Sequence, residues 1–138
     1  MKLISFLSIS LLFILIATSC SARPRQYYDD GISDEEYIRI TGETKEARAF
    51  LDQFPESEIL VDRSSKLAVD YQFTKVQPAT TEQRWEGIRL RVFINPDQKR
   101  AEGALIQCSD QDGGPHFINE ELIRYLEQYA ESHGCPQR

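Results

Sequence analysis

The sequence holds few of the residues on which catalytic and metal sites depend. Two of its 138 residues are histidine and three are cysteine. No two cysteines have the Cys-x-x-Cys spacing that makes a zinc site a strong prediction. The sequence also lacks the Gly-x-Ser-x-Gly motif that carries a nucleophilic serine. These absences weigh against a catalytic or metal-dependent function, and we expect no cofactor.

Positive charge is scarce relative to negative charge. The chain has 22 acidic and 16 basic residues, which gives a formal net charge of −6. Nucleic-acid-binding domains gather lysine and arginine into a basic patch or stripe, and the sequence shows no such stripe. We therefore expect no nucleic-acid partner. The acidic excess favours solubility and says little else about function.

The stretch from Glu58 to Cys108 shows the alternation of apolar and polar residues that is typical of β-strands. Residues 62–65 and 95–97 carry turn-forming side chains, and a longer connection lies around residues 77–81. Short connections make neighbouring strands antiparallel, so we predict a four-stranded antiparallel meander with one apolar face. The apolar positions are Ile59 and Val61, then Leu67, Val69, Tyr71 and Phe73, then Ile88, Leu90, Val92 and Ile94, then Ala104, Ile106 and Cys108.

Helical spacing of apolar residues flanks this stretch on both sides. The first predicted helix spans residues 43–54 after a Thr41 cap, and the second begins after Asn119 and ends near His133 and Gly134. The fold class is therefore α+β, in the order helix, four-stranded antiparallel β-meander, helix, within a single domain of residues 41–138. This order loosely resembles cystatin-like and PepSY-like modules, a resemblance that implies a helix paired with a curled meander and no particular function.

The first 20 residues have the form of an export signal. Lys2 precedes an apolar core over residues 3–16, which is shorter than the roughly 20 residues that a membrane span needs. The small residues Thr18 and Ser19 then lead to Cys20. This ending resembles the lipobox of the bacterial lipoprotein signal class, in which small residues precede the cysteine that is cleaved and lipidated. The resemblance implies acyl chains, palmitate among them, on Cys20 and a lipid anchor in the cell envelope.

The same resemblance bears on the location of the protein. Ser21 after the cysteine implies the outer membrane if the host has one, whereas Ala17 stands where leucine is usual in this class. An ordinary signal peptidase could instead cleave after Ser19 or after Ala22, which would leave a secreted soluble protein. An uncleaved membrane anchor is a third alternative.

Residues 21–40 are polar and acidic with few aliphatic side chains. This composition predicts a flexible acidic tether between the signal and the domain. Tyr27, Tyr28 and Tyr37 lie within the stretch, and they could instead dock on the domain or on a partner.

The best metal candidates are Asp110 and Asp112, which stand at positions three and five of an EF-hand loop aligned on Gly113. Cys108 and Asn119 then occupy the two positions where a calcium loop needs carboxylates. We therefore predict no metal site, and we interpret the segment as a solvated turn.

A set of Cys108, His116, His133 and Cys135 could be imagined as zinc ligands or, in part, as a nucleophile with its base. His133 is better explained as a cation at a helix C-terminus, and His116 as a loop residue. Oxidising conditions outside the cytoplasm usually pair cysteines. Because lipid on Cys20 would leave two cysteines, we predict a disulfide between Cys108 and Cys135.

The second face of the predicted sheet carries the candidate binding residues Asp70, Gln72, Arg89, Arg91 and Phe93. Interfaces favour arginine and aromatic side chains, although a plain solvated face is the alternative. We expect an envelope-anchored, non-catalytic binding or accessory domain of protein-interaction or inhibitor type. A small periplasmic or surface hydrolase is the alternative function. Leu60, Ala68 and Leu105 share this face, and Arg91→Glu is expected to weaken partner binding with little effect on folding.

Overall fold

The computed structural model describes residues 28–64, 66–76, 85–110 and 116–136. They form an α+β fold in which two helices precede an antiparallel sheet and a third helix follows it, which confirms the predicted class. The elements are α1 (Asp34–Gly42), α2 (Lys45–Gln53), β1 (Glu58–Asp62), β2 (Ala68–Val76), β3 (Glu86–Asn95), β4 (Arg100–Ser109), β5 (His116–Ile118) and α3 (Leu122–Ser132).

The strands pair in chain order, β1-β2-β3-β4-β5, and each pair is antiparallel. The predicted four-stranded meander is therefore confirmed, and the short strand β5 extends it beside β4. Tyr71 on β2 lies opposite Ile59 on β1 and Leu90 on β3, and Leu90 lies opposite Ile106 on β4. All of these side chains except Ile59 are fully buried, so the apolar alternation marks the covered face.

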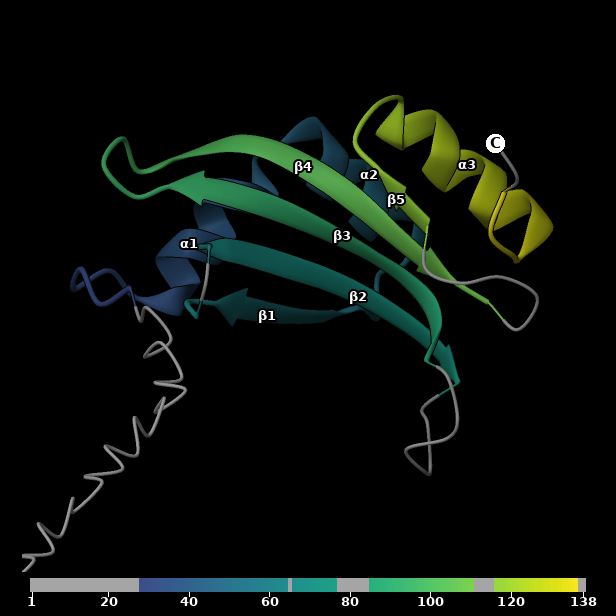
Figure 1. Ribbon diagram of the computed structural model, residues 1–138, viewed down its shortest axis with the longest axis horizontal. Coiled ribbons are helices and arrows are strands. Elements are labelled where there is room, and N and C mark those ends of the chain that lie inside the picture. The colour runs from purple at the N-terminus through teal and green to yellow at the C-terminus, as the bar shows by residue number, and fades with distance from the viewer. Residues whose placement is uncertain (1–27, 65, 77–84, 111–115, 137–138) are drawn as a thin grey trace, which may run out of the picture.

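The helices lie on one side of the curved sheet, as Figure 1 shows. One surface hollow is lined by Lys45 and Leu122, which are the first residues of α2 and α3. A second hollow is lined by Phe54, which follows α2, and by Tyr129, which is near the end of α3. The two helices therefore run in the same direction across the apolar face. No helix in the described part of the chain has the length and apolar character that crossing a membrane requires.

Helix α1 corrects the predicted tether over residues 34–40. Ser33 is its N-cap and accepts a hydrogen bond from the Glu36 backbone N–H at 3.3 Å, and the acidic first turn suits the helix dipole. Tyr37 and Thr41 are fully buried. The Thr41 hydroxyl lies 2.7 Å from the Tyr71 hydroxyl, so α1 is joined to the sheet through its buried side.

The two predicted helices begin at different residues in the structure. The helix predicted over 43–54 is α2, which starts at Lys45 after the N-cap Thr44, while Thr41 belongs to α1. Helix α3 starts at Leu122, and its N-cap is Glu121 in the left-handed conformation rather than Asn119. His133 is the C-cap and is also left-handed, which agrees with the predicted end of that helix.

Arg63 fastens the beginning of the described chain to the sheet. Its guanidinium donates to the Tyr28 backbone oxygen at 2.9 Å, to the Ile32 backbone oxygen at 2.7 Å and to Asp34 Oδ1 at 2.6 Å. It also stacks over the Tyr37 ring, with 4.9 Å from Cζ to the ring centroid. The Arg63 side chain is 10% exposed, so these contacts form in a largely desolvated place. Residues 28–34 are therefore held against the end of β1.

Candidate functional site

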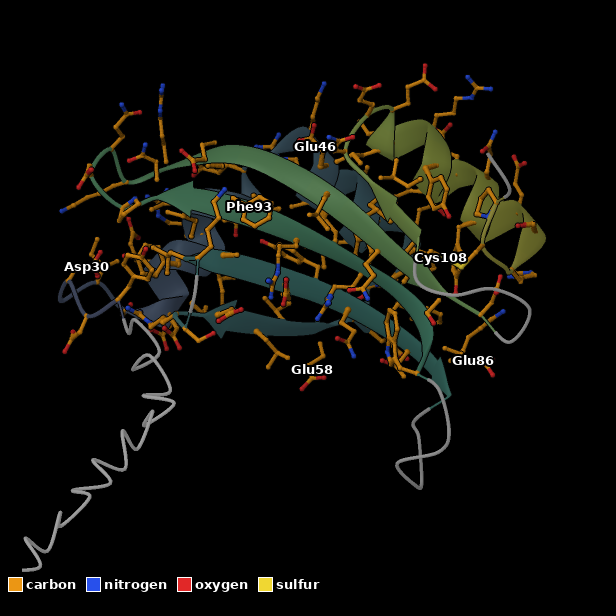
Figure 2. The ribbon with its side chains drawn as sticks, viewed as in Figure 1. Asp30, Glu46, Glu58, Glu86, Phe93 and Cys108 are labelled. Atoms are coloured by element: carbon orange, nitrogen blue, oxygen red, sulfur yellow. A yellow bond between two sulfur atoms is a disulfide. The ribbon has the colours of Figure 1, made fainter. Side chains whose placement is uncertain are left out.

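The face of the sheet opposite the helices carries polar and apolar side chains together, and we call it the open face. The register confirms that the five predicted candidates share it, since Asp70 lies opposite Arg91, Gln72 opposite Arg89, and Phe93 opposite Ala68. In Figure 2, Phe93 projects from β3 on the viewer's side of the sheet, whereas Glu46 lies on α2 behind it. The same alternation adds Leu60 and Asp62 on β1, and Leu105 and Gln107 on β4.

A nearly buried carboxylate lies at the centre of the open face. Asp70 is 5% exposed. Arg91 on the neighbouring strand donates from Nε to Asp70 Oδ1 and from Nη2 to Asp70 Oδ2, both at 2.7 Å. Arg91 Nη2 also donates to Asp62 Oδ2 at 2.9 Å. Two carboxylates thus fix the position of Arg91, and the bidentate contact is the arrangement that guanidinium geometry favours.

These contacts shift the pKa values of Arg91 and Asp62. Hydrogen bonds to Asp70 raise the pKa of Arg91 above its ordinary value. Burial by itself would raise the pKa of Asp62, but hydrogen bonds from Ser64 and the charge of Arg91 outweigh it and lower that pKa. Both groups are therefore charged around neutral pH.

The contacts of Arg91 contradict the expectation that Arg91→Glu would spare folding. A glutamate at this position would place a third carboxylate beside Asp70 and Asp62 and would remove their shared cation. Breaking a largely buried ion pair in this way is strongly destabilising. Arg91 therefore has a structural role, and partner binding must be tested at other residues of the open face.

Arg89 is less fully paired than Arg91. Its Nη2 donates to Gln107 Oε1, and its Nη1 lies 3.7 Å from Asp70 Oδ2. Its Nε is buried and has no hydrogen-bond partner among the described residues. Leaving a buried donor unsatisfied costs about 1 to 3 kcal/mol. The Arg89 side chain is 31% exposed, so part of it can be reached from solvent.

Trp85 closes one end of the open face. Its Nε1 donates to Thr74 Oγ1 at 3.2 Å, and Gln72 Nε2 donates to the same oxygen at 3.0 Å. Thr74 is two residues beyond Gln72 on β2 and lies opposite Gly87. At Gly87 a Cβ atom would lie 2.2 Å from the Phe73 backbone oxygen, so glycine is required where β3 passes the irregularity in β2.

Apolar side chains surround the ionic centre. Leu60 is 46% exposed, and among the described residues it is the one large hydrophobic residue that is exposed. Leu60 and Leu105 lie in the same cross-strand row as Asp70 and Arg91. Near the far end of the face, Lys66 Nζ lies 4.3 Å from the centroid of the Phe93 ring.

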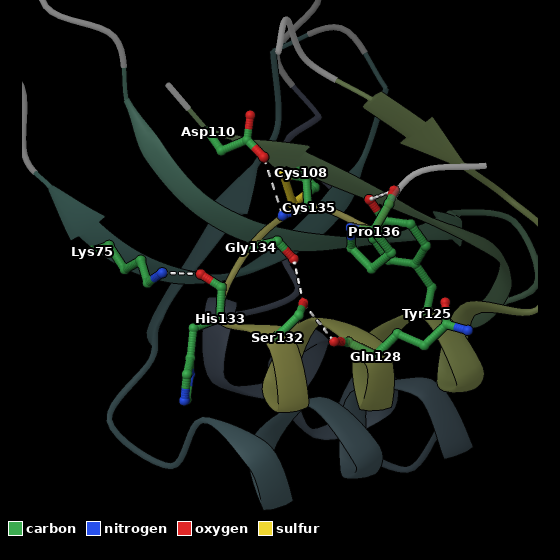
Figure 3. Close-up of a disulfide and its surroundings, with 10 residues drawn as sticks. All are labelled: Lys75, Cys108, Asp110, Tyr125, Gln128, Ser132, His133, Gly134, Cys135 and Pro136. Atoms are coloured by element: carbon green, nitrogen blue, oxygen red, sulfur yellow. Dashed lines mark hydrogen bonds between the residues drawn. A yellow bond between two sulfur atoms is a disulfide. The ribbon is translucent and has the colours of Figure 1, made fainter. Parts of the chain in front are cut away.

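The predicted disulfide joins Cys108 on β4 to Cys135 beyond α3 (Figure 3). Neither sulfur is therefore available as a thiolate, which removes the imagined zinc ligands and the cysteine nucleophile. Asp110 Oδ2 accepts a hydrogen bond from the Cys135 backbone N–H at 3.2 Å. Asp110 thus helps to hold the end of the chain, and within the described residues no metal-binding group of three His, Cys, Asp or Glu side chains occurs.

The second hollow is lined by Phe54, Phe73 and Tyr129 and has a volume of about 410 Å³. The rings of Phe54 and Phe73 stack at 4.7 Å between centroids. Burial raises the pKa of Tyr129 to about 12. Lys75 donates to the His133 backbone oxygen, so a cation meets the carbonyl end of α3 (Figure 3). His133 is the C-cap of α3, the helix end at which the sequence places it, and its side chain is exposed.

Several predicted site residues lie outside the described part of the chain. They are Cys20 and Asp112, together with the side chain of His116, whose backbone belongs to β5. Asp62, Thr74, Trp85 and Gln107 are residues of the open face that the sequence analysis missed, although the alternation that revealed Asp70 and Arg89 also covers Asp62, Thr74 and Gln107. Comparison with family models, curated proteins and solved structures finds no match to this chain.

Proposed function

We propose that this chain is a non-catalytic domain that is exported, anchored to the cell envelope through lipid on Cys20, and bound to a protein partner through the open face of its sheet. In a host with two membranes, the anchor lies in the outer membrane. The observation that carries the binding proposal is that Leu60 is 46% exposed on a face that no described helix covers, in the same cross-strand row as the ion pair of Asp70 and Arg91.

The chemistry of the open face supports a protein partner. Interface centres are enriched in arginine and aromatic residues, and this face combines Arg89 and Arg91 with Phe93 and Trp85. Asp70 holds Arg91 in one position before any partner arrives. A side chain that is already ordered loses little conformational entropy on binding, and this raises the affinity that a given contact area provides.

The entry point of the chain supports the anchoring proposal. Arg63 holds Tyr28 and Asp34 at the end of the sheet that also carries the β3–β4 turn, while the disulfide lies toward the opposite end (Figures 1 and 2). An anchor that precedes residue 28 would hold the β3–β4 end nearest to the membrane. The open face would then extend away from the membrane surface and stay accessible to a partner.

The first test of this proposal is the intact mass of the mature protein. We expect Cys20 to be the first residue and to carry acyl chains, because the signal class that residues 17–20 resemble is cleaved just before a cysteine that carries lipid. Cys20→Ala is the control and should lack the added mass. An unmodified first residue at Cys20 or Arg23 would show that an ordinary signal peptidase processes the chain.

The second test is partner capture by the full chain with Leu60→Glu. A partner that buries Leu60 would have to desolvate the new carboxylate, so recovery of the partner after cross-linking in the envelope should fall at least tenfold, a change of about 1.4 kcal/mol. Gln128→Glu adds the same charge on the exposed side of α3 and is the matched control. Equal recovery with both variants would refute the open face as the binding surface.

A further inference from the structure

We infer that Arg89 is the point at which the open face receives a carboxylate group, supplied by an acidic side chain within an extended segment of the partner. This inference rests on the proposed function, because it names the chemistry of the partner at the same surface. It separates the two arginines of β3 into a structural residue and a residue available for binding.

The charge of Arg91 is already paired. Its Nε and Nη2 donate to the carboxylates of Asp70 and Asp62 at 2.7 to 2.9 Å. Arg89 contacts a neutral amide oxygen of Gln107, and its nearest carboxylate oxygen is 3.7 Å away on Asp70, which Arg91 already binds with two hydrogen bonds. An incoming anion therefore meets a guanidinium with no carboxylate in hydrogen-bond contact at Arg89, and a guanidinium already neutralised by two carboxylates at Arg91.

The free protein also leaves a donor of Arg89 without an acceptor. The Nε of Arg89 is buried and unpaired among the described residues. A guanidinium binds a carboxylate best with two parallel N–H donors, and an arginine side chain can turn about its stem to present Nε and one Nη to solvent. A bound carboxylate would then satisfy the donor that the unbound arrangement leaves unsatisfied.

The neighbours of Arg89 define the rest of the ligand. Gln72 and Gln107 flank it directly on β2 and β4, so no acidic side chain lies immediately across either strand. Glu58 ends the same row on β1, two strand spacings or about 9 to 10 Å away. Repulsion from that exposed carboxylate is small at physiological ionic strength.

Leucine side chains lie one row away from Arg89. Leu105 is next to Arg91 on β4, and Leu60 is at the edge of the same row on β1. Residues two apart on a strand share a face and are separated by about 6.6 Å. An extended segment with an acidic residue and an aliphatic residue two positions away would thus place its carboxylate at Arg89 and its aliphatic group over the row that holds Leu105 and Leu60.

Two blocked peptides test this chemistry directly. The full chain in detergent micelles is titrated with acetyl-Leu-Thr-Glu-Thr-Leu-amide and with the same peptide carrying glutamine in place of glutamate. Trp85 is the one tryptophan of the sequence and lies on the open face, so its fluorescence reports binding. The Nε–H resonance of Arg89 in a ¹⁵N correlation spectrum reports the hydrogen bond itself. We expect the acidic peptide to bind about tenfold more tightly and to shift that resonance, since a charge-assisted hydrogen bond is roughly twice as strong as a neutral one.

Arg89→Gln should remove the preference for the acidic peptide, and Arg89→Lys should retain part of it, because lysine keeps the charge without the two-donor fork. Arg91 keeps Asp70 paired in both variants, so unchanged spectral dispersion elsewhere shows that the fold is intact. Equal affinity for the two peptides, no binding of either, or a preference that persists in Arg89→Gln would overturn the inference.

The capture experiment with Leu60→Glu separates this inference from the proposed function. If Leu60→Glu abolishes capture while Arg89→Gln does not, the open face binds a partner and the carboxylate inference is wrong. If the acidic peptide binds through Arg89 but neither variant changes capture, the carboxylate site is real and the captured partner does not bind through the open face.

Discussion

Replacing Asp70 with alanine is expected to lower the free energy of unfolding by about 3 kcal/mol, the low end of the cost of removing one member of a buried ion pair. Asp70 is 5% exposed and accepts two 2.7 Å hydrogen bonds from Arg91. Without it, Arg89 and Arg91 face each other two residues apart on β3 with one carboxylate, Asp62, still in contact with Arg91. Because both arginine side chains are partly exposed, water recovers some of their solvation, and the low end of the range applies.

Urea unfolding of matched variants measures this effect. Asp62→Ala is the control, because it removes the other carboxylate bound to Arg91, together with its hydrogen bonds from Ser64, at a place where the side chain is 24% exposed. Its cost should be about 1 to 2 kcal/mol and therefore below that of Asp70→Ala, because a solvent-accessible ion pair contributes at most about 1 kcal/mol and a hydrogen bond about 1 kcal/mol. The double variant Asp70→Leu with Arg91→Met should be more stable than Asp70→Ala, since it removes both members of the buried ion pair and takes partners only from Asp62 and Arg89, which are 24% and 31% exposed. Equal losses in Asp70→Ala and Asp62→Ala would contradict a special role for the buried carboxylate.

The sheet and its two faces could be predicted from the sequence because they depend on local alternation. Turn chemistry added the boundaries. The Asp62 carboxylate accepts from the Ser64 backbone N–H at 2.9 Å, and Asn95 Oδ1 accepts from the Gln98 N–H at 3.0 Å, as expected for side chains that bond to their own turns. The pairing of Cys108 with Cys135 followed from a count, because lipid on Cys20 leaves two of the three cysteines. Each of these inferences needs a short window of sequence or a simple count.

Helix α1 was missed although the sequence contains a signal for it. Ser33 and Glu36 have the spacing of a capping box, and Tyr37 and Thr41 are four residues apart on one side of a helix. The acidic composition of residues 21–40 outweighed this pattern. The acidic segment is nevertheless ordered, because Arg63, which is 29 residues after Asp34 in sequence, supplies a cation that binds the Asp34 carboxylate.

Other features depend on contacts that no local pattern contains. The N-cap of α3 is Glu121, which has the left-handed conformation. The helix therefore begins two residues later than it would if Asn119, the residue type favoured at an N-cap, were the cap. Strand β5 has three residues and is defined by its pairing with β4, so it is too short to show an alternation of its own. The different roles of Arg89 and Arg91 follow from which one reaches Asp62, and that depends on how β1, β2 and β3 lie together.

Removing the disulfide should lower the free energy of unfolding by about 3.5 kcal/mol, as the chain-entropy model gives for a loop of this length. Cys108 and Cys135 are 27 residues apart in sequence, and both are buried. The variant carries Cys108→Ala and Cys135→Ala and keeps Cys20, so that anchoring is unchanged. Urea unfolding with and without reductant gives the comparison, and non-reducing peptide mapping should find the two cysteines of the unaltered protein in one linked species.

The loss should fall mainly on α3, because the bond holds the residues that follow this helix to the last long strand. Asp110 still binds the Cys135 N–H, and the Tyr125 hydroxyl still donates to the Pro136 backbone oxygen at 3.4 Å, so the helix should loosen rather than detach (Figure 3). Hydrogen exchange should therefore quicken in α3 and change little in α2 and β2. Free thiols at both positions, or a melting temperature that reductant does not change, would refute this role. A uniform loss of protection across the domain would instead show that α3 and the sheet unfold as one unit.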